Sequence, residues 1–165
     1  MPIDATLAGR SYPPTPPYHV GREKIREFAD AVGDTSPACR DPEAARLLGH
    51  PDVIAPPTFP IVVTLRAAEQ VLADPSVGVV GVVGAVGAVG VEMSRVVHGD
   101  QRFTATRPVR AGDQLVVETT VDRVREMAGN AIITVRGEVR TTAGEHVCTS
   151  SSTLVVRGAA AAEKL

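Results

Sequence analysis

The segment "GDTSPACRD", residues 33–41, contains side chains that could take part in acid–base or nucleophilic chemistry. It offers a carboxylate at Asp34, a hydroxyl at Ser36 and a thiol at Cys39, with Pro37 favouring a turn between them. A carboxylate placed five residues before a base or nucleophile could be half of an active site. No histidine lies in or beside this segment. The open question is which group would serve as the partner of Asp34.

Each of the four histidines is a candidate for that partner. We expect His19, in a proline-rich segment, and His146, after a turn, to be ordinary strand-end or surface residues. His50 lies just before a predicted buried helix, where we expect it to cap or pack. His98, in "VVHGDQRF", is the histidine beside a Gly-Asp pair on a predicted core strand, so it is the candidate base for Asp34. The alternative interpretation of His98 is a strand residue that is hydrogen-bonded to a neighbour.

The composition argues against several classes of partner. The 165 residues contain 17 Lys and Arg against 19 Asp and Glu, with 3% aromatics, which disfavours nucleic acid and membrane surfaces. The cysteines and histidines lack metal-site spacing, and no nucleotide-binding motif is present, so we predict no metal and no cofactor. The first residues contain no apolar signal core, and the longest apolar run, 77–91, is shorter than a membrane span. We therefore expect a soluble, cytoplasmic protein.

Helical patterns occupy the first half of the chain. The segment 21–32 has apolar residues at helical spacing and ends before a glycine, and 41–50 begins with Asp41, a good capping residue. The segment 55–75 predicts a helix with Thr58 as its cap. It contains few charges, which indicates that this helix is deeply buried. Its apolar residues are Ile61, Val62, Leu65, Ala68 and Leu72.

The second half of the chain predicts strands. The segments 93–109, 114–126, 131–142 and 146–158 are rich in β-branched residues and are separated by short Gly, Asn and Asp turns, which is typical of an antiparallel meander. A buried helix followed by such a meander indicates an α+β fold in which the sheet wraps the helix. We predict one domain over 1–158, with a Gly/Val-rich insertion at 77–91 as loop or irregular strand. We expect 159–165 to be a disordered tail.

Several motifs together resemble the MaoC-like hot-dog dehydratases. They are the "GDTSP" loop after a helix, "GHPDVIAPPTF" and "RPVRAGDQLVVETTV". "REKIREFADAVGD" together with "SRVVHGDQRF" looks most like the A/C-type subunits of actinobacterial (3R)-hydroxyacyl-acyl-carrier-protein dehydratases. The resemblance runs from about Ala8 to Arg157. It implies a hot-dog fold, with a long central helix wrapped by an antiparallel sheet.

The resemblance breaks at one catalytic position. Catalytic members carry a Gly-Asp-x-Asn-Pro-x-His loop, and Gly33, Asp34 and Pro37 match it. Ser36 stands at the Asn position, and Cys39 stands at the His position. A thiol is mostly protonated at neutral pH, whereas a histidine titrates there. An activated Cys39 would need a neighbouring cation, for which Arg40 is the local candidate.

The resemblance therefore implies a subunit that is inactive alone. It would bind the acyl chain through Ser36, Pro57, Thr58 and Phe59, and it would pair through its first long strand with a MaoC-like partner that carries the intact dyad. The substrate would be a 3-hydroxyacyl thioester on acyl carrier protein or CoA, in fatty-acid or polyketide-type elongation. Two alternatives remain open. One is a self-sufficient hydratase homodimer that uses Asp34 with His98 or Cys39, and the other is a non-enzymatic acyl-thioester binding module.

Overall fold

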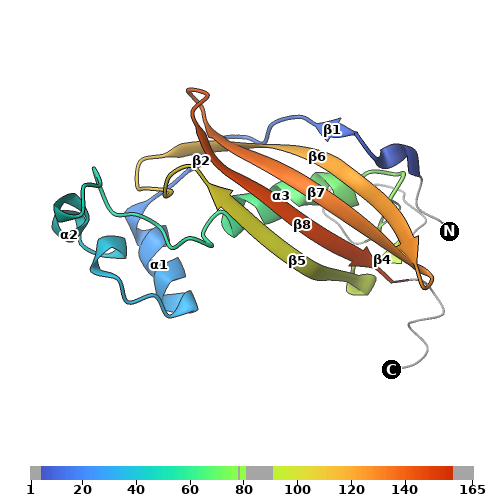
Figure 1. Ribbon diagram of the computed structural model, residues 1–165, viewed down its shortest axis with the longest axis horizontal. Helices are drawn as coiled ribbons and strands as arrows, with labels where there is room; N and C mark the ends of the chain where they lie inside the picture. The colour runs from blue at the N-terminus through green and yellow to red at the C-terminus, as the bar shows by residue number, and fades with distance from the viewer. Residues whose placement is uncertain (1–4, 78, 81–90, 158–165) are drawn as a thin grey trace.

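The computed structural model describes residues 5–77, 79–80 and 91–157 (Figure 1). The predicted tail and most of the predicted 77–91 insertion lie outside these residues. The helical elements are η1 (Ala5–Leu7), α1 (Arg22–Val32), η2 (Pro37–Cys39), α2 (Pro42–Leu47), α3 (Ile61–Leu72) and η3 (Met93–Arg95). The strands are β1 (Ser11–Tyr12), β2 (Tyr18–His19), β3 (Val79–Val80), β4 (Val91–Glu92), β5 (Val96–Ala105), β6 (Gln114–Met127), β7 (Asn130–Thr141) and β8 (His146–Val156).

The long strands form one antiparallel sheet that curves around α3 (Figure 1). The strand order is β1-β6-β7-β8-β5, with β2 also paired to β6, so β5 is an edge strand. The predicted meander and the α+β fold are confirmed. The short strands β3 and β4, at the two ends of the predicted insertion, pair in parallel.

The helix boundaries confirm two predicted signals and correct a third. Gly33 ends α1 in the left-handed conformation with φ 72°, and the Asp41 side chain caps α2 by accepting a hydrogen bond from the Glu43 N–H at 2.8 Å. Thr58, however, does not cap α3. The helix begins at Ile61, and the capping position is Pro60, which makes no side-chain hydrogen bond. Thr58 lies in a turn before the helix, where its backbone carbonyl accepts a hydrogen bond from the N–H of Ile61.

The helix α3 is buried on one side rather than all round. Val63, Ala67 and Val71 face the sheet and are almost inaccessible, whereas the side chain of Leu65 is 50% exposed. The prediction of a deeply buried helix therefore holds for the sheet-facing side only, because nothing in the described chain covers the opposite side. None of the described helices is long and apolar enough to cross a bilayer, and α3 has twelve residues.

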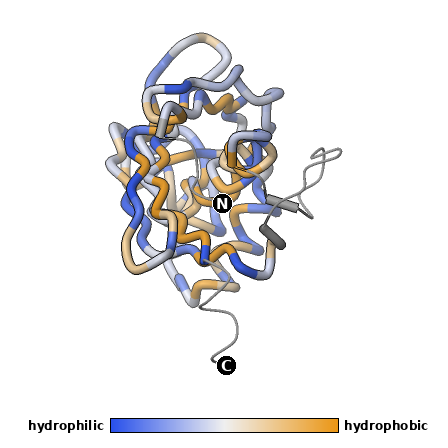
Figure 2. Tube along the Cα trace, turned by 90° about the vertical axis from the view of Figure 1, so that its right-hand side faces the viewer, coloured by the Kyte–Doolittle hydropathy of each residue, from blue (hydrophilic) through white to orange (hydrophobic). Residues whose placement is uncertain are grey.

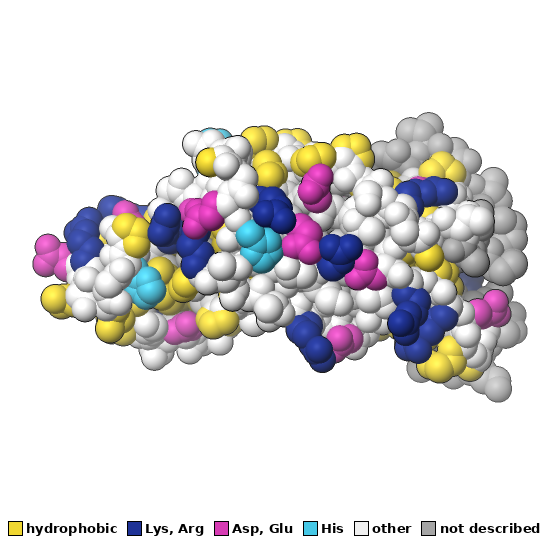
Figure 3. All heavy atoms as spheres, turned by 45° about the horizontal axis from the view of Figure 1, so that its top comes forward, with side chains coloured by type: hydrophobic (Ala, Val, Ile, Leu, Met, Phe, Trp, Pro, Cys, Tyr) yellow, Lys and Arg dark blue, Asp and Glu magenta, His cyan; other side chains and the backbone are white. Residues whose placement is uncertain are grey.

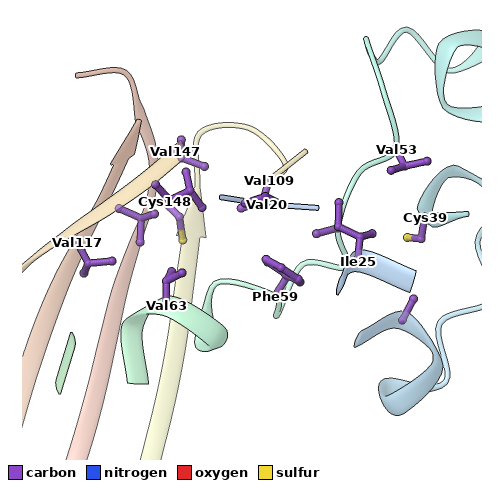
Figure 4. Packing of buried hydrophobic residues seen from close by; sticks show 14 of the residues in the cluster. Val20, Ile25, Cys39, Val53, Phe59, Val63, Val109, Val117, Val147 and Cys148 are labelled. Carbon is purple, nitrogen blue, oxygen red and sulfur yellow. The ribbon is translucent and has the colours of Figure 1, made fainter. Parts of the chain in front are cut away.

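The core is divided along the sheet into two clusters. The alternation of apolar and polar residues along the strands is visible in Figure 2, and along β6 alternate residues such as Leu115, Val117 and Val121 are buried. One cluster joins α1, the start of α3 and one end of the sheet, and Phe59 lies in it between Val63 and Ile25 (Figure 4). The other cluster contains Leu7, Val71 and the opposite end of the sheet. The loop that could carry chemistry belongs to the first cluster.

The motif "RPVRAGD" forms the connection from β5 to β6, where its first and last residues bind each other. Arg107 donates two hydrogen bonds to the nearly buried carboxylate of Asp113, at 2.8 and 2.9 Å, and two more to Glu145. The contacts with Glu145 and Asp113 raise the pKa of Arg107. Gly112 has φ 88°, which favours glycine. This partly buried, bidentate pair fixes the turn between β5 and β6.

A second polar cluster gives a testable pH dependence. Asp74, just after α3, accepts hydrogen bonds from Arg10 at 2.6 Å, Tyr12 at 2.9 Å and the Ser76 backbone at 2.8 Å. Burial alone would raise the pKa of Asp74, but these donors outweigh it and lower the pKa to about 2. The folded pKa lies below the unfolded one, so the stabilisation is complete above about pH 5 and disappears as the pH falls toward 2.

We expect Asp74→Asn to lower the free energy of unfolding at pH 7 by about 1–2 kcal/mol, because Arg10 is partly exposed and solvent screens the pair. Denaturant unfolding at neutral pH and near pH 3 measures this effect, and the loss should shrink at the lower pH. Glu126→Gln, on an exposed side chain of β6, is the control. An equal loss at both pH values would contradict the ionic contribution.

Candidate active site

The loop after α1 is shaped by backbone hydrogen bonds. The N–H of Asp34 donates to the carbonyl of Ala29 at 2.8 Å, which closes the last turn of α1. The side chain of Asp34 then accepts a hydrogen bond from the N–H of Ser36 through Oδ1 at 2.9 Å. This is an Asx turn, a role that the sequence pattern allows for Asp34. The turn leaves Oδ2 free to face Cys39, whose Sγ lies 3.9 Å away.

These side chains open onto a cavity of about 440 Å³. One wall is the loop, a second is the chain leading into α3, and a third is the end of β5 with the turn that follows it. The residues that line it are Asp34, Ser36, Cys39, Ile54, Ala55, Pro56, Pro57, Pro60, Ala105, Thr106, Arg107, Pro108 and Val109. The loop thus builds a mostly apolar cavity with one carboxylate, even though the motif's histidine is missing.

Cys39 remains a thiol in this environment. Its side chain is 3% exposed, and burial, followed by the charge of Asp34, raises its pKa. Arg40, the cation that could have stabilised a thiolate, instead donates to Asp30 at 2.6 Å and to the backbone oxygen of Asp34 at 2.7 Å. A protonated thiol is a poor proton acceptor near neutral pH, so this environment does not favour Cys39 as a base.

The predicted substrate-binding residues fall into two groups. Ser36 and Pro57 line the cavity. Thr58 is exposed and is not part of the lining. Phe59 is fully buried and packs edge-to-face against Phe28, with 5.3 Å between ring centroids, so it belongs to the core and not to the cavity wall. Neighbouring residues in this turn point in opposite directions, which the sequence pattern did not reveal.

The structure does not bring His98 to Asp34. His98 lies on β5, where its Nε2 is 3.1 Å from Oε1 of Gln101. The cavity begins at Ala105, seven residues along the same strand, which is roughly 20 Å away. All four histidines lie in the described chain, and none lines the cavity. One chain therefore does not contain an Asp34–His98 pair.

His146 lies nearer to the cavity than the sequence suggested. Its Nδ1 is 2.6 Å from Oγ1 of Thr106, a lining residue, and its Nε2 is 3.1 Å from Oε2 of Glu138. Thr106 and His146 are 40 residues apart and meet only because β5 pairs with β8. The sequence analysis missed Thr106, Arg107 and Pro108 as lining residues, although their place at the end of a core strand was a usable signal.

The molecular surface agrees with the charge balance of the sequence. Figure 3 shows one face on which acidic and basic side chains are interspersed over the sheet, without an extended area of one sign. Some charged side chains of the sheet form pairs, such as Arg136 with Asp122 and Glu138. This face lacks the contiguous basic area that binding to nucleic acid requires.

The antiparallel sheet that curves around α3 is the fold of the hot-dog dehydratases, and comparisons with known proteins agree. A family model described as "FAS1-like, dehydratase domain region" matches residues 6–150. The chain therefore belongs to this family of MaoC-like hot-dog dehydratases.

Similar proteins are found among sequences and among solved structures. A UPF0336 protein of Streptomyces coelicolor is 57% identical over 159 residues, covering 96% of this chain and 98% of the relative. A UPF0336 protein of Saccharopolyspora erythraea is 51% identical over 160 residues, covering 97% of this chain and 95% of the relative. The solved structure of the truncated HadBC complex, a (3R)-hydroxyacyl-ACP dehydratase from Mycobacterium tuberculosis, has a TM-score of 0.73 and 32% identity, covering 90% of this chain and 96% of that one.

Proposed function

We propose that this chain is the non-catalytic subunit of a (3R)-3-hydroxyacyl-thioester dehydratase. It binds the acyl group and supports a MaoC-like partner that carries an intact Gly-Asp-x-Asn-Pro-x-His loop. The observation that carries the proposal is the cavity beside Asp34, which is formed in full but has a buried, protonated thiol at Cys39 in place of the histidine.

The chemistry explains why this substitution matters. Dehydration removes a proton from Cα of the thioester and expels the C3 hydroxyl as water, so the site needs both a base and an acid. Besides the Cys39 thiol, the ionisable side chains in the lining are Asp34, whose Oδ1 accepts from the N–H of Ser36 and whose Oδ2 faces Cys39, and Arg107, which is paired with Asp113 and Glu145. No group in this cavity can exchange protons as a neutral histidine does. The partner's loop supplies that group in our proposal.

The free edge of the sheet supports a partner. The strand β5 is ten residues long and, within the described chain, pairs only with β8. An unprotected edge of that length is a site for pairing with another chain. The HadBC structure, which resembles this chain over most of its length, is described as a complex.

The test is to measure hydration of a crotonyl thioester by this chain, by a MaoC-like chain with the intact motif from the same genome, and by their mixture. We expect turnover by the complex and none by this chain alone. Asp34→Asn here should change the rate of the complex by less than about threefold, whereas loss of the partner's histidine should lower it by roughly 10²–10⁴-fold.

The same assay separates the alternatives. Robust turnover by the isolated chain that disappears in Asp34→Asn would establish a self-sufficient hydratase and overturn the proposal. Binding of the thioester without turnover, alone and in the mixture, would indicate a binding module instead. Comparing acyl-carrier and CoA thioesters in the active mixture identifies the carrier.

A further inference from the structure

A series of hydrogen bonds joins three strands and ends at the mouth of the cavity. It runs from Glu138 on β7, through His146 on β8, to Thr106 just after β5. A carboxylate, an imidazole and a hydroxyl in that order are the groups that activate the nucleophile in serine-type hydrolases. The proposed dehydratase function requires none of these three side chains, so their arrangement needs an explanation of its own.

The carboxylate of Glu138 has three polar neighbours. Its Oε1 accepts a hydrogen bond from Nη1 of Arg136 at 2.9 Å, and its Oε2 accepts from the hydroxyl of Thr149 at 2.8 Å. The third neighbour is Nε2 of His146, 3.1 Å from Oε2. Burial alone would raise the pKa of Glu138, but these hydrogen bonds outweigh burial and lower the pKa. Glu138 is therefore ionised at neutral pH and can only accept hydrogen bonds.

These contacts assign the tautomer of the His146 ring. Glu138 only accepts, and the Thr149 hydroxyl, whose proton goes to Glu138, presents its oxygen to Nε2 at 3.0 Å. Nε2 therefore carries the ring proton. In the neutral ring Nδ1 is then an acceptor, and it lies 2.6 Å from Oγ1 of Thr106. The Thr106 hydroxyl donates to Nδ1, and the remaining lone pair of its oxygen is available to a ligand.

The cavity has an apolar floor and an open mouth beside this hydroxyl. Ala55 and Val109 are buried lining residues, whereas Pro57 and Thr106 are exposed lining residues. A short acyl chain is stabilised by burial on the floor, and its polar head group remains in water. In that orientation the thioester carbonyl of the ligand lies toward the mouth, where Thr106 is located.

We propose that Thr106, His146 and Glu138 form a hydrolytic site for acyl thioesters. Oγ1 of Thr106 bonds to the carbonyl carbon, and Nδ1 of His146 takes the hydroxyl proton. The C–S bond then breaks, and the thiol leaves with the proton from Nδ1. A water molecule, which gives a proton to Nδ1 in the same way, attacks the acyl-threonine ester. The carboxylic acid is released, and the proton returns to Thr106.

This activity goes beyond the proposed function and does not depend on it. Hydrolysis needs a nucleophile and a base, which Thr106 and His146 supply, whereas dehydration needs the histidine that the Asp34 loop lacks. Thr106 and His146 contact the reacting atoms. Glu138 acts through His146 as a positioning residue, because it fixes the ring tautomer.

The first test measures the release of free thiol from hexanoyl-CoA by the purified chain. This thioester has neither a double bond nor a C3 hydroxyl, so thiol release reports hydrolysis and not hydration. We expect Thr106→Val and His146→Ala each to lower the rate by at least about a hundredfold. Thr106→Ser retains the hydroxyl and should keep or raise the rate. Thr104→Val, the same change at an exposed threonine two residues earlier, should have no effect.

Three further readouts separate catalysis from folding. Peptide mass spectrometry after an acid quench should find hexanoyl-Thr106 in the wild-type chain and not in Thr106→Val. Added imidazole should restore activity to His146→Ala, because the His146 side chain is 28% exposed and its place is open to solvent. Glu138→Gln should lower kcat with little change in KM, because an amide can donate to Nε2 and reverse the tautomer. The melting temperature of each variant shows that it is folded.

A wild-type chain that releases no thiol above the uncatalysed rate, or a rate that Thr106→Val leaves unchanged, would overturn the inference. Acylation of Cys39 in place of Thr106 would overturn the assignment of the nucleophile. The crotonyl assay tests the proposed function separately. Hydration by the mixture without thiol release removes only the hydrolytic site, and thiol release without hydration by the mixture removes only the dehydratase subunit.

Discussion

The variant Cys39→His with Ser36→Asn will give this chain hydratase activity of its own. These two substitutions rebuild the Gly-Asp-x-Asn-Pro-x-His loop on a backbone that already holds Asp34 in the cavity wall. We expect the rate of enoyl-thioester hydration to rise at least about a hundredfold above the wild-type chain, because a positioned acid–base group contributes about that much or more.

The geometry allows the change. Sγ of Cys39 lies 3.9 Å from Oδ2 of Asp34, so a longer imidazole at that position has a carboxylate within hydrogen-bond reach to orient it. The cavity of about 440 Å³ has room for the ring beside a substrate. The ordinary pKa of histidine lies near 6.5, and the charge of Asp34 favours the protonated ring, so a bell-shaped pH profile near neutrality is expected.

Matched variants make the result interpretable. Cys39→Ala should remain inactive, and Asp34→Asn in the rebuilt loop should remove the gained activity. The assay should be repeated in the complex, where the rebuilt cavity would add a second site to that of the partner. A rebuilt chain that is folded, as judged by its melting temperature, but inactive in both settings would show that more than the histidine has been lost.

The architecture was predictable because each local signal agreed with the next. Four successive segments rich in alternating β-branched residues can form little other than an antiparallel sheet. Gly33 ends α1 and Asp41 caps α2, which are common roles for glycine and aspartate at helix ends. The exposed face of α3 was not predictable in this way. Leu65 belongs to the same apolar helix as Val63, and the difference between them depends on which side the sheet covers.

The site was predictable only in part, for a similar reason. The Asx turn of Asp34 and the lining role of Pro57 follow from short motifs. Phe59 is two residues beyond Pro57 but turns into the core against Phe28, which only the packing decides. Thr106 and His146 are in contact because β5 pairs with β8. Such a pairing joins residues that are far apart in the sequence, so local patterns do not reveal it.

The variant Gln101→Pro, at the free edge of the sheet, will leave the chain folded but weaken its binding to the MaoC-like partner. The Thr106 N–H donates to Val147 on β8, and alternate residues of an antiparallel strand point the same way. Arg102 therefore directs its N–H toward β8, whereas Gln101 directs its N–H away from the sheet. Proline at Gln101 removes a donor that the chain itself does not use, and proline is tolerated at such edge positions.

We expect Gln101→Pro to stay folded, with a melting temperature close to that of Gln101→Ala, the control that also loses the contact with Ser150. Its affinity for the MaoC-like partner should fall by roughly a hundredfold or more, because proline removes a central hydrogen bond and its ring obstructs the approaching strand. The activity of the mixture at a fixed concentration should fall together with this affinity. Gln101→Ala should keep most of the affinity and most of the activity. Full activity in a mixture containing Gln101→Pro would place the partner on a surface other than β5. The next surface to test would be the exposed side of α3, which includes the half-exposed Leu65.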